Sequence, residues 1–140
     1  MRRRACIAVL FSVLLLQLSS CARKSLSPDE LQSEITTALS LAADADSSLR
    51  LLREGRLLST FFEGHIEKLS DEARSASQEL RSRATADPVM ALQVRECQRD
   101  LDRLIAALTI AGQHSGTRLS DAGEQIAATH KALESLAAAQ

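Results

Sequence analysis

Apolar residues recur along the chain in four series, with steps of mostly three and four residues inside each series. That spacing places all members of a series on one side of an α-helix. Each series also follows the seven-residue period of a coiled-coil seam. The seams are Leu31, Ile35, Ala38, Ala42, Ala45, Leu49 and Leu52; Phe62, Ile66, Leu69, Ala73, Ala76, Leu80 and Ala84; Met90, Val94, Cys97, Leu101, Leu104, Leu108 and Ala111; and Leu119, Ala122, Ile126, Thr129, Leu133 and Leu136.

These seams predict an all-α protein with four amphipathic helices of about 22–28 residues and short connections. Helices of similar length with short connections favour an antiparallel four-helix bundle. We expect this bundle to occupy residues 28–138 as a single domain. One alternative is three helices, the last of them long and bent from residue 88 onward, because neither Gly112 nor Gly116 alone forces a break.

Residues typical of helix ends flank the first seam. In Ser27-Pro28-Asp29-Glu30, Ser27 suits the N-cap, Pro28 the first helical position and Glu30 the third position of a capping box. Gly55 can adopt the left-handed conformation that ends many helices. The sequence therefore predicts a first helix between Pro28 and Gly55.

The later boundaries carry weaker signals of the same kind. Thr60 and Glu63 form a second capping-box pattern, although the helix can also begin near Leu57. Asp87 and Pro88 suit the N-cap and first position of a third helix. Residues 112–118, which include two glycines, are expected to form the last turn.

Composition agrees with a helical protein. Hydrophobic residues make up 45% of the chain and are mostly Leu and Ala, whereas aromatic residues make up 2%. Leu and Ala are strong helix formers, and β-branched and aromatic residues favour strands. Of the neighbours Phe61 and Phe62, we expect one to anchor the core and the other to be half exposed.

The first twenty residues have the pattern of an export signal. Arg2, Arg3 and Arg4 precede the apolar stretch 5–16, which is too short to span a bilayer as a helix. The sequence Leu18-Ser19-Ser20-Cys21 then resembles the lipobox of bacterial lipoproteins: a branched apolar residue, two small residues and a cysteine. An ordinary cleaved signal and an uncleaved membrane helix are the alternatives.

The resemblance covers residues 1–21 and implies a signal peptide at 1–20, lipid attachment at Cys21 and a lipidated tether at 21–27. The Cys21 thiol would carry a diacylglyceryl group, and its freed amine a further acyl chain; two or three chains anchor stably. Ala22, rather than Asp, after the cysteine implies transport to the outer membrane, facing the periplasm. Arg23 and Lys24 would then lie among anionic headgroups or in a solvated tether.

Charge narrows the classes of partner. The chain has 17 Lys and Arg and 18 Asp and Glu. Removal of the three arginines at positions 2–4 would leave 14 basic residues and a net charge of about −4. A mildly acidic protein of this kind is not expected to bind nucleic acid, which requires a basic surface.

Catalytic and metal-binding patterns are not found in the sequence. His65, His114 and His130 are isolated, without an HExxH or Glu-x-x-His motif, and we expect no metal, no cofactor and no catalytic residue. Cys97 lies on the third seam, where a buried, inert thiol is the main interpretation and a disulfide between two copies the alternative.

Charged residues follow the pattern of solvated helix faces. Asp71, Glu72, Asp100 and Asp102 lie among basic residues, and pairs such as Asp46–Arg50, Lys68–Glu72 and Glu79–Arg83 are four apart. A stripe formed by Arg95, Arg99 and Arg103 could bind an anionic partner. Nearby acidic residues favour a mixed surface instead.

The sequence therefore predicts a membrane-anchored lipoprotein of the cell envelope that is not an enzyme. We expect it to be a helical interaction or structural module that binds an envelope protein or a second copy of itself. The alternative is a periplasmic helical bundle that binds a small molecule or a metal, since bundle interiors can hold such sites.

Overall fold

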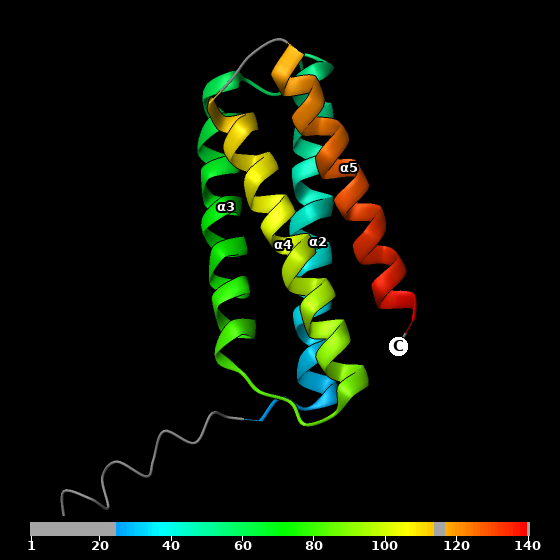
Figure 1. Cartoon of the computed structure of the whole chain (residues 1–140). Helices are drawn as coiled ribbons and strands as arrows, with labels where there is room; N and C mark the ends of the chain where they lie inside the picture. The colour runs from blue at the N-terminus through cyan, green and yellow to red at the C-terminus, as the bar shows by residue number, and fades with distance from the viewer. Residues whose placement is uncertain (1–24, 114–116, 140) are drawn as a thin grey trace, which may run out of the picture.

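The computed structural model describes residues 25–113 and 117–139, and these form four helices (Figure 1). The helices are α2 (Pro28–Arg53), α3 (Ser59–Ser82), α4 (Pro88–Gln113) and α5 (Thr117–Ala138), of 26, 24, 26 and 22 residues. They run antiparallel to their chain neighbours. The predicted four-helix bundle is confirmed.

The order of packing closes the bundle. Helices α2 and α4 each pack against both α3 and α5, so α2 and α4 lie across the diagonal. Because α5 folds back along α4, the alternative of one long bent last helix is wrong. In the described part of the chain, no helix is long and apolar enough to cross a membrane.

Local signals set the ends of α2 as predicted. The Ser27 hydroxyl accepts a hydrogen bond from the Glu30 backbone N–H at 3.2 Å, and the Glu30 carboxylate accepts one from the Ser27 N–H at 3.0 Å. Gly55 has a φ of 67°. Its N–H donates to the Leu52 carbonyl, and the Arg56 N–H donates to that of Leu51, which satisfies the last carbonyls of the helix.

The start of α3 differs from the capping box predicted at Thr60. The N-cap is Leu58, which has no side chain that can cap, and Thr60 already lies in the first turn. Because α3 begins two residues earlier than predicted, it gains backbone hydrogen bonds such as that from the Phe62 N–H to the Leu58 carbonyl. At the start of α4, by contrast, the Asp87 carboxylate accepts from the Val89 N–H at 2.9 Å, as its position before Pro88 predicted.

The four seams form the core almost unchanged. Leu52, Val94 and Leu119 are partly buried, Ala84 is exposed beyond the end of α3, and the other seam residues are buried. Phe62 anchors the core at 1% exposure, whereas Phe61 is 67% exposed. The core is wider than the seams, since Leu26, Leu41 and Ala107 are also buried. Helices in a closed bundle bury a broader stripe than a two-stranded coiled coil does.

The bundle has two chemically different ends. At the end that we call proximal, a parallel bridge joins Ser25 to Ala84, and the Leu26 N–H donates to the Ala84 carbonyl at 3.0 Å. The start of α4 lies at the same end, and α5 runs back toward this end but stops short of it (Figure 1). The opposite, distal end carries the turn between α2 and α3.

Candidate functional site

The predicted lipid attachment residue, Cys21, lies outside the described residues. The structure does describe the point where the chain joins the bundle, because Ser25 is the fourth residue after Cys21. Leu26 is buried and fixes this segment against the end of α3. The chain after Cys21 is therefore held at the proximal end from its fourth residue onward.

An ion-pair cluster reinforces the proximal end. Arg83, after the last turn of α3, pairs with Glu30 of α2 at 2.9 Å and with Glu79 one turn earlier. The Arg83 side chain is 14% exposed, whereas those of Glu30 and Glu79 are 32% and 50% exposed, so the arginine is the shielded member of the cluster. Glu30 thus both caps α2 and ties it to α3. Burial, together with the nearby Glu79 carboxylate, raises the pKa of Glu34 in the next turn, although Arg83 opposes the shift.

Exposed apolar side chains lie on the first turns of α4, also at the proximal end. Val89 is 65% exposed and Leu92 is 49% exposed. The predicted arginine stripe continues this helix toward the distal end. Arg103 and Arg99 lie 3.1 and 3.9 Å from the Asp100 carboxylate, whereas Arg95 has no ion pair to any residue that the structure describes.

Asp100 corrects a sequence prediction. It was expected on a solvated face, but its side chain is 4% exposed and lies against α5. Burial raises its pKa, and the guanidinium groups of Arg99 and Arg103 partly offset the effect. Asp102 does face solvent, where Arg81 binds both of its carboxylate oxygens at 2.7 Å and Ser77 donates to it at 3.1 Å.

Cys97 is buried and unpaired, in agreement with its place on the third seam. Burial, with smaller contributions from the Asp100 and Glu34 carboxylates, raises the pKa of its thiol to about 12. The thiol is therefore protonated at neutral pH and lacks the thiolate that nucleophilic chemistry needs. Its burial also keeps it from a thiol of a second copy in the folded state.

The described histidines lie beside separate carboxylates rather than in a shared site. His65 of α3 lies 3.2 Å from the Asp44 carboxylate of α2, and His130 lies 3.7 Å from Glu134 on its own helix. His114 lies outside the described residues. Over residues 25–113 and 117–139, no group of three or more His, Cys, Asp or Glu side chains has a geometry that could hold a metal ion.

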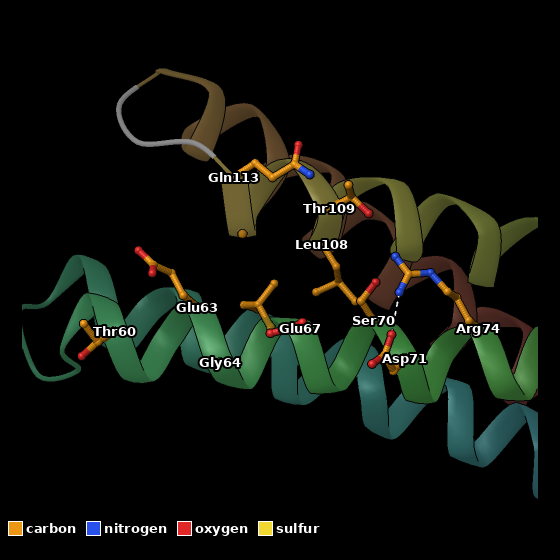
Figure 2. Close-up of a pocket in the computed structure, with 12 residues that line it drawn as sticks. Thr60, Glu63, Gly64, Glu67, Ser70, Asp71, Arg74, Leu108, Thr109 and Gln113 are labelled. Carbon is orange, nitrogen blue, oxygen red and sulfur yellow. Dashed lines mark hydrogen bonds and ion pairs between the residues drawn. The ribbon is translucent and has the colours of Figure 1, made fainter.

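A groove lies between α3 and α4, in the distal half of the bundle (Figure 2). Its volume is about 560 Å³. Ile66 and Leu108 contribute apolar surface, and Thr109 and Gln113 line it from α4. Carboxylates line it from α3: Glu63, Glu67 and Asp71, the last paired with Arg74 at 2.6 Å.

Small residues create this groove. A Cβ atom at Gly64 would meet no other heavy atom within 4 Å, and Gly112 lies on the facing helix. Ser70 lines the groove, and its buried hydroxyl oxygen has no hydrogen-bond partner among the described residues. The sequence analysis missed this groove. The available signal was Gly64, since a glycine inside a helix costs stability and usually has a packing or functional reason.

Apolar residues are also exposed at the distal end. Leu58 and Phe61, at the start of α3, are each 67% exposed. They lie close to Thr60 and Glu63 at the edge of the groove.

Comparison with known proteins found no matching family model, no matching curated protein and no matching solved structure.

Proposed function

We propose that this chain is a bacterial lipoprotein of the cell envelope, anchored to the membrane through an acylated Cys21. The observation that carries the proposal is the sequence Leu18-Ser19-Ser20-Cys21 behind three arginines and an apolar stretch. The mature part is a helical module that binds an envelope protein or a second copy of itself and is not an enzyme. The anchor lies on the periplasmic side, in the outer membrane.

The fold supports this proposal because the two ends of the bundle differ and lie far apart. A lipid on Cys21 would hold the proximal end near the bilayer. The 26 residues of α2 make a helix about 39 Å long, so the distal end would stand that far from the proximal end. Leu58 and Phe61 would then be presented away from the membrane, where another envelope protein can reach them.

The chemistry of the buried groups agrees with a role other than catalysis. The Asp100 and Glu34 carboxylates help to raise the pKa of the Cys97 thiol, and this thiol is enclosed by the helices rather than open to a substrate. A nucleophile needs an activating base and access to its substrate.

Replacement of the acylated residue tests the anchor. In cells grown with an alkyne-labelled fatty acid, the wild-type chain is expected to incorporate the label and lose residues 1–20. Cys21→Ser should abolish both, because a hydroxyl is a far weaker nucleophile than a thiolate. Cys6→Ser, within the apolar stretch, is the matched control and should process normally. Equal labelling of the Cys21→Ser chain and the wild type would refute the proposal.

Binding of a small molecule is the second candidate, favoured by the groove and by the unpaired Ser70 hydroxyl within it. The core between the helices is filled by apolar side chains, so the groove replaces the bundle interior as the candidate place. Its carboxylates favour a small amine, and its buried hydroxyl favours a ligand that also has a hydrogen-bonding group.

Titration of the full chain with spermidine tests this candidate by NMR. Chemical-shift changes are expected to concentrate at the Gly64 and Gly112 amides. Gly64→Leu should abolish them, because its Cβ enters open space and the rest of the side chain would occupy the groove. Shifts spread over all acidic surfaces and unchanged in Gly64→Leu would show nonspecific charge attraction and exclude the site.

A further inference from the structure

Two apolar side chains at the proximal end face solvent. Val89 and Leu92 are three residues apart on α4, and therefore lie on the same side of the helix. Both are largely uncovered in the isolated chain, at 65% and 49% exposure. They lie at the end of the bundle where the chain arrives from Cys21 (Figure 1).

We propose that the first turns of α4 rest on the lipid bilayer, with Val89 and Leu92 at the boundary between headgroups and acyl chains and Arg95 among the lipid phosphates. This inference depends on the proposed function, because it takes the acylated Cys21 as the point of attachment. It adds a second, noncovalent contact that would orient the bundle on the membrane.

The length of the intervening chain carries the first argument. Three residues lie between Cys21 and Ser25, and the four residue steps that join the two span about 13 Å in a fully extended chain. Ser25 is itself bridged to Ala84, a few residues before the start of α4. A lipid on Cys21 therefore keeps the first turns of α4 close to the bilayer surface, and water is not their only neighbour.

The spacing along α4 carries the second argument. A helix rises about 1.5 Å per residue, so Leu92 lies about 4.5 Å and Arg95 about 9 Å from Val89 along the axis. If α4 meets the bilayer with its N-terminal end, the apolar pair lies deeper than the arginine. That is the order of the acyl-chain boundary and the lipid phosphates.

Charge supports the same orientation. Arg95 has no ion pair within residues 25–113 and 117–139, so its guanidinium group can bind a phosphate without first breaking a contact. Arg99 lies one turn further along the same stripe. Asp87 flanks the apolar pair and caps α4 by accepting the Val89 N–H, whereas Asp29 lies on α2, across the diagonal from α4. An anionic surface therefore favours contact through α4.

A second copy of the chain fits this surface less well. Stable protein interfaces bury on the order of 1,000 Å² or more in total. Val89 and Leu92 are two side chains flanked by an arginine and an aspartate, which is a small apolar area for a dimer. A bilayer needs no complementary surface and accepts both the apolar pair and the neighbouring positive charge.

Spin labels on the full, acylated chain in lipid vesicles test the inference. A nitroxide is attached to Leu92→Cys, and, as the matched control at the distal end, to Phe61→Cys. Both positions are exposed, so neither change should disturb folding, and Cys97 is buried with a thiol pKa of about 12 and should not react. Vesicles contain phosphatidylcholine with or without phosphatidylglycerol. Collisions with oxygen and with a water-soluble nickel complex report the depth of each label.

The label at position 92 is expected to collide with the nickel complex several-fold less often than the label at position 61. It should also collide with oxygen more often, because oxygen is concentrated in the bilayer. This difference between the two labels should be larger in vesicles that contain phosphatidylglycerol. In the Arg95→Glu variant, the difference should be the same with and without this lipid.

Three outcomes would overturn the inference. Equal exposure of both labels to water, in a chain whose intact mass shows the acyl groups, would refute the membrane contact and leave the proposed function standing. Dipolar coupling between Leu92 labels on different chains would show that a second copy covers this surface. A mass without acyl groups would refute the proposed function, and this inference with it.

Discussion

Asp100 shows how the surroundings of one residue change its chemistry. Its neighbours in sequence are charged, and a carboxylate among arginines is normally a solvated surface group. In the bundle, α5 covers it, and burial raises its pKa more than Arg99 and Arg103 lower it. The charged form of Asp100 is therefore disfavoured in the folded chain.

Asp100→Asn is expected to increase the free energy of unfolding at neutral pH. The folded chain holds the Asp100 proton in a pH range above the ordinary pKa of 3.8, where the unfolded chain has lost it. The contribution of Asp100 to the free energy of unfolding of the wild type is thus present at acidic pH and is lost as the pH rises through that range. Asparagine does not ionise, so the advantage of the variant should disappear in acid. Urea denaturation at acidic and neutral pH measures both effects.

A double-mutant cycle provides the control. Arg103→Gln should destabilise the wild type at neutral pH, since it removes the partner at 3.1 Å, and should have little effect in the Asp100→Asn background. If Asp100→Asn instead lowers stability most at neutral pH, the ion pair outweighs burial and our account of this carboxylate is wrong.

Sequence patterns predicted burial well where a residue belongs to a seam and poorly where it lies beside one. Seam residues from Leu31 to Leu136 are mostly buried, because the seven-residue period alone determines which way they face. Asp100 lies between the seam residues Cys97 and Leu101. Whether such a position is covered depends on the approach of α5, which the period of α4 does not encode.

At the scale of elements, the approach of α5 to α2 depends on a single glycine. A Cβ atom at Gly123 of α5 would lie 2.5 Å from a methyl group of Leu49 on α2 and would also contact the guanidinium group of Arg53. Arg53 can move because its charged end reaches the Ser120 carbonyl near the surface. Leu49 is 1% exposed and has little room to move.

Gly123→Ala should therefore destabilise the bundle by about 1–3 kcal/mol, the usual cost of overpacking a core. Gly64→Ala is the matched control, because its Cβ would meet nothing within 4 Å. It replaces a glycine within a helix and should stabilise the protein by about 0.5–1 kcal/mol. Urea denaturation of both variants measures the difference. Similar effects of the two substitutions would contradict the role given to Gly123.

The two glycines also mark a limit of the sequence analysis. Glycines near the ends of helices were interpreted correctly at Gly55, which has the positive φ that ends α2. Gly112, expected in a turn, lies inside α4 instead. Gly64 and Gly123 lie inside helices for opposite reasons, an open groove and a close contact. Both reasons depend on what lies opposite the glycine in the folded bundle. The sequence of α3 or of α5 alone does not contain that information.

At the scale of the whole molecule, the two ends of the bundle differ in their chemistry, although the four helices have similar lengths. The proximal end combines the Glu30–Arg83 pair, the exposed Val89 and Leu92, and the arrival of the chain from Cys21. The distal end combines exposed Leu58 and Phe61 with the groove. The sequence predicted the helices but not this division, because the division arises when four antiparallel segments bring distant residues to the same end. The anchor at Cys21 stays a prediction.

The even number of helices has a practical consequence for experiments that attach tags. Because α2 begins at the proximal end and α5 runs back toward it, the proposed anchor at Cys21 would place an affinity tag or fluorescent protein fused after residue 140 on the membrane side of the bundle. An epitope inserted at Gly55, in the turn between α2 and α3, would instead project from the opposite end of the molecule. Antibodies added from the aqueous side should reach that position most easily.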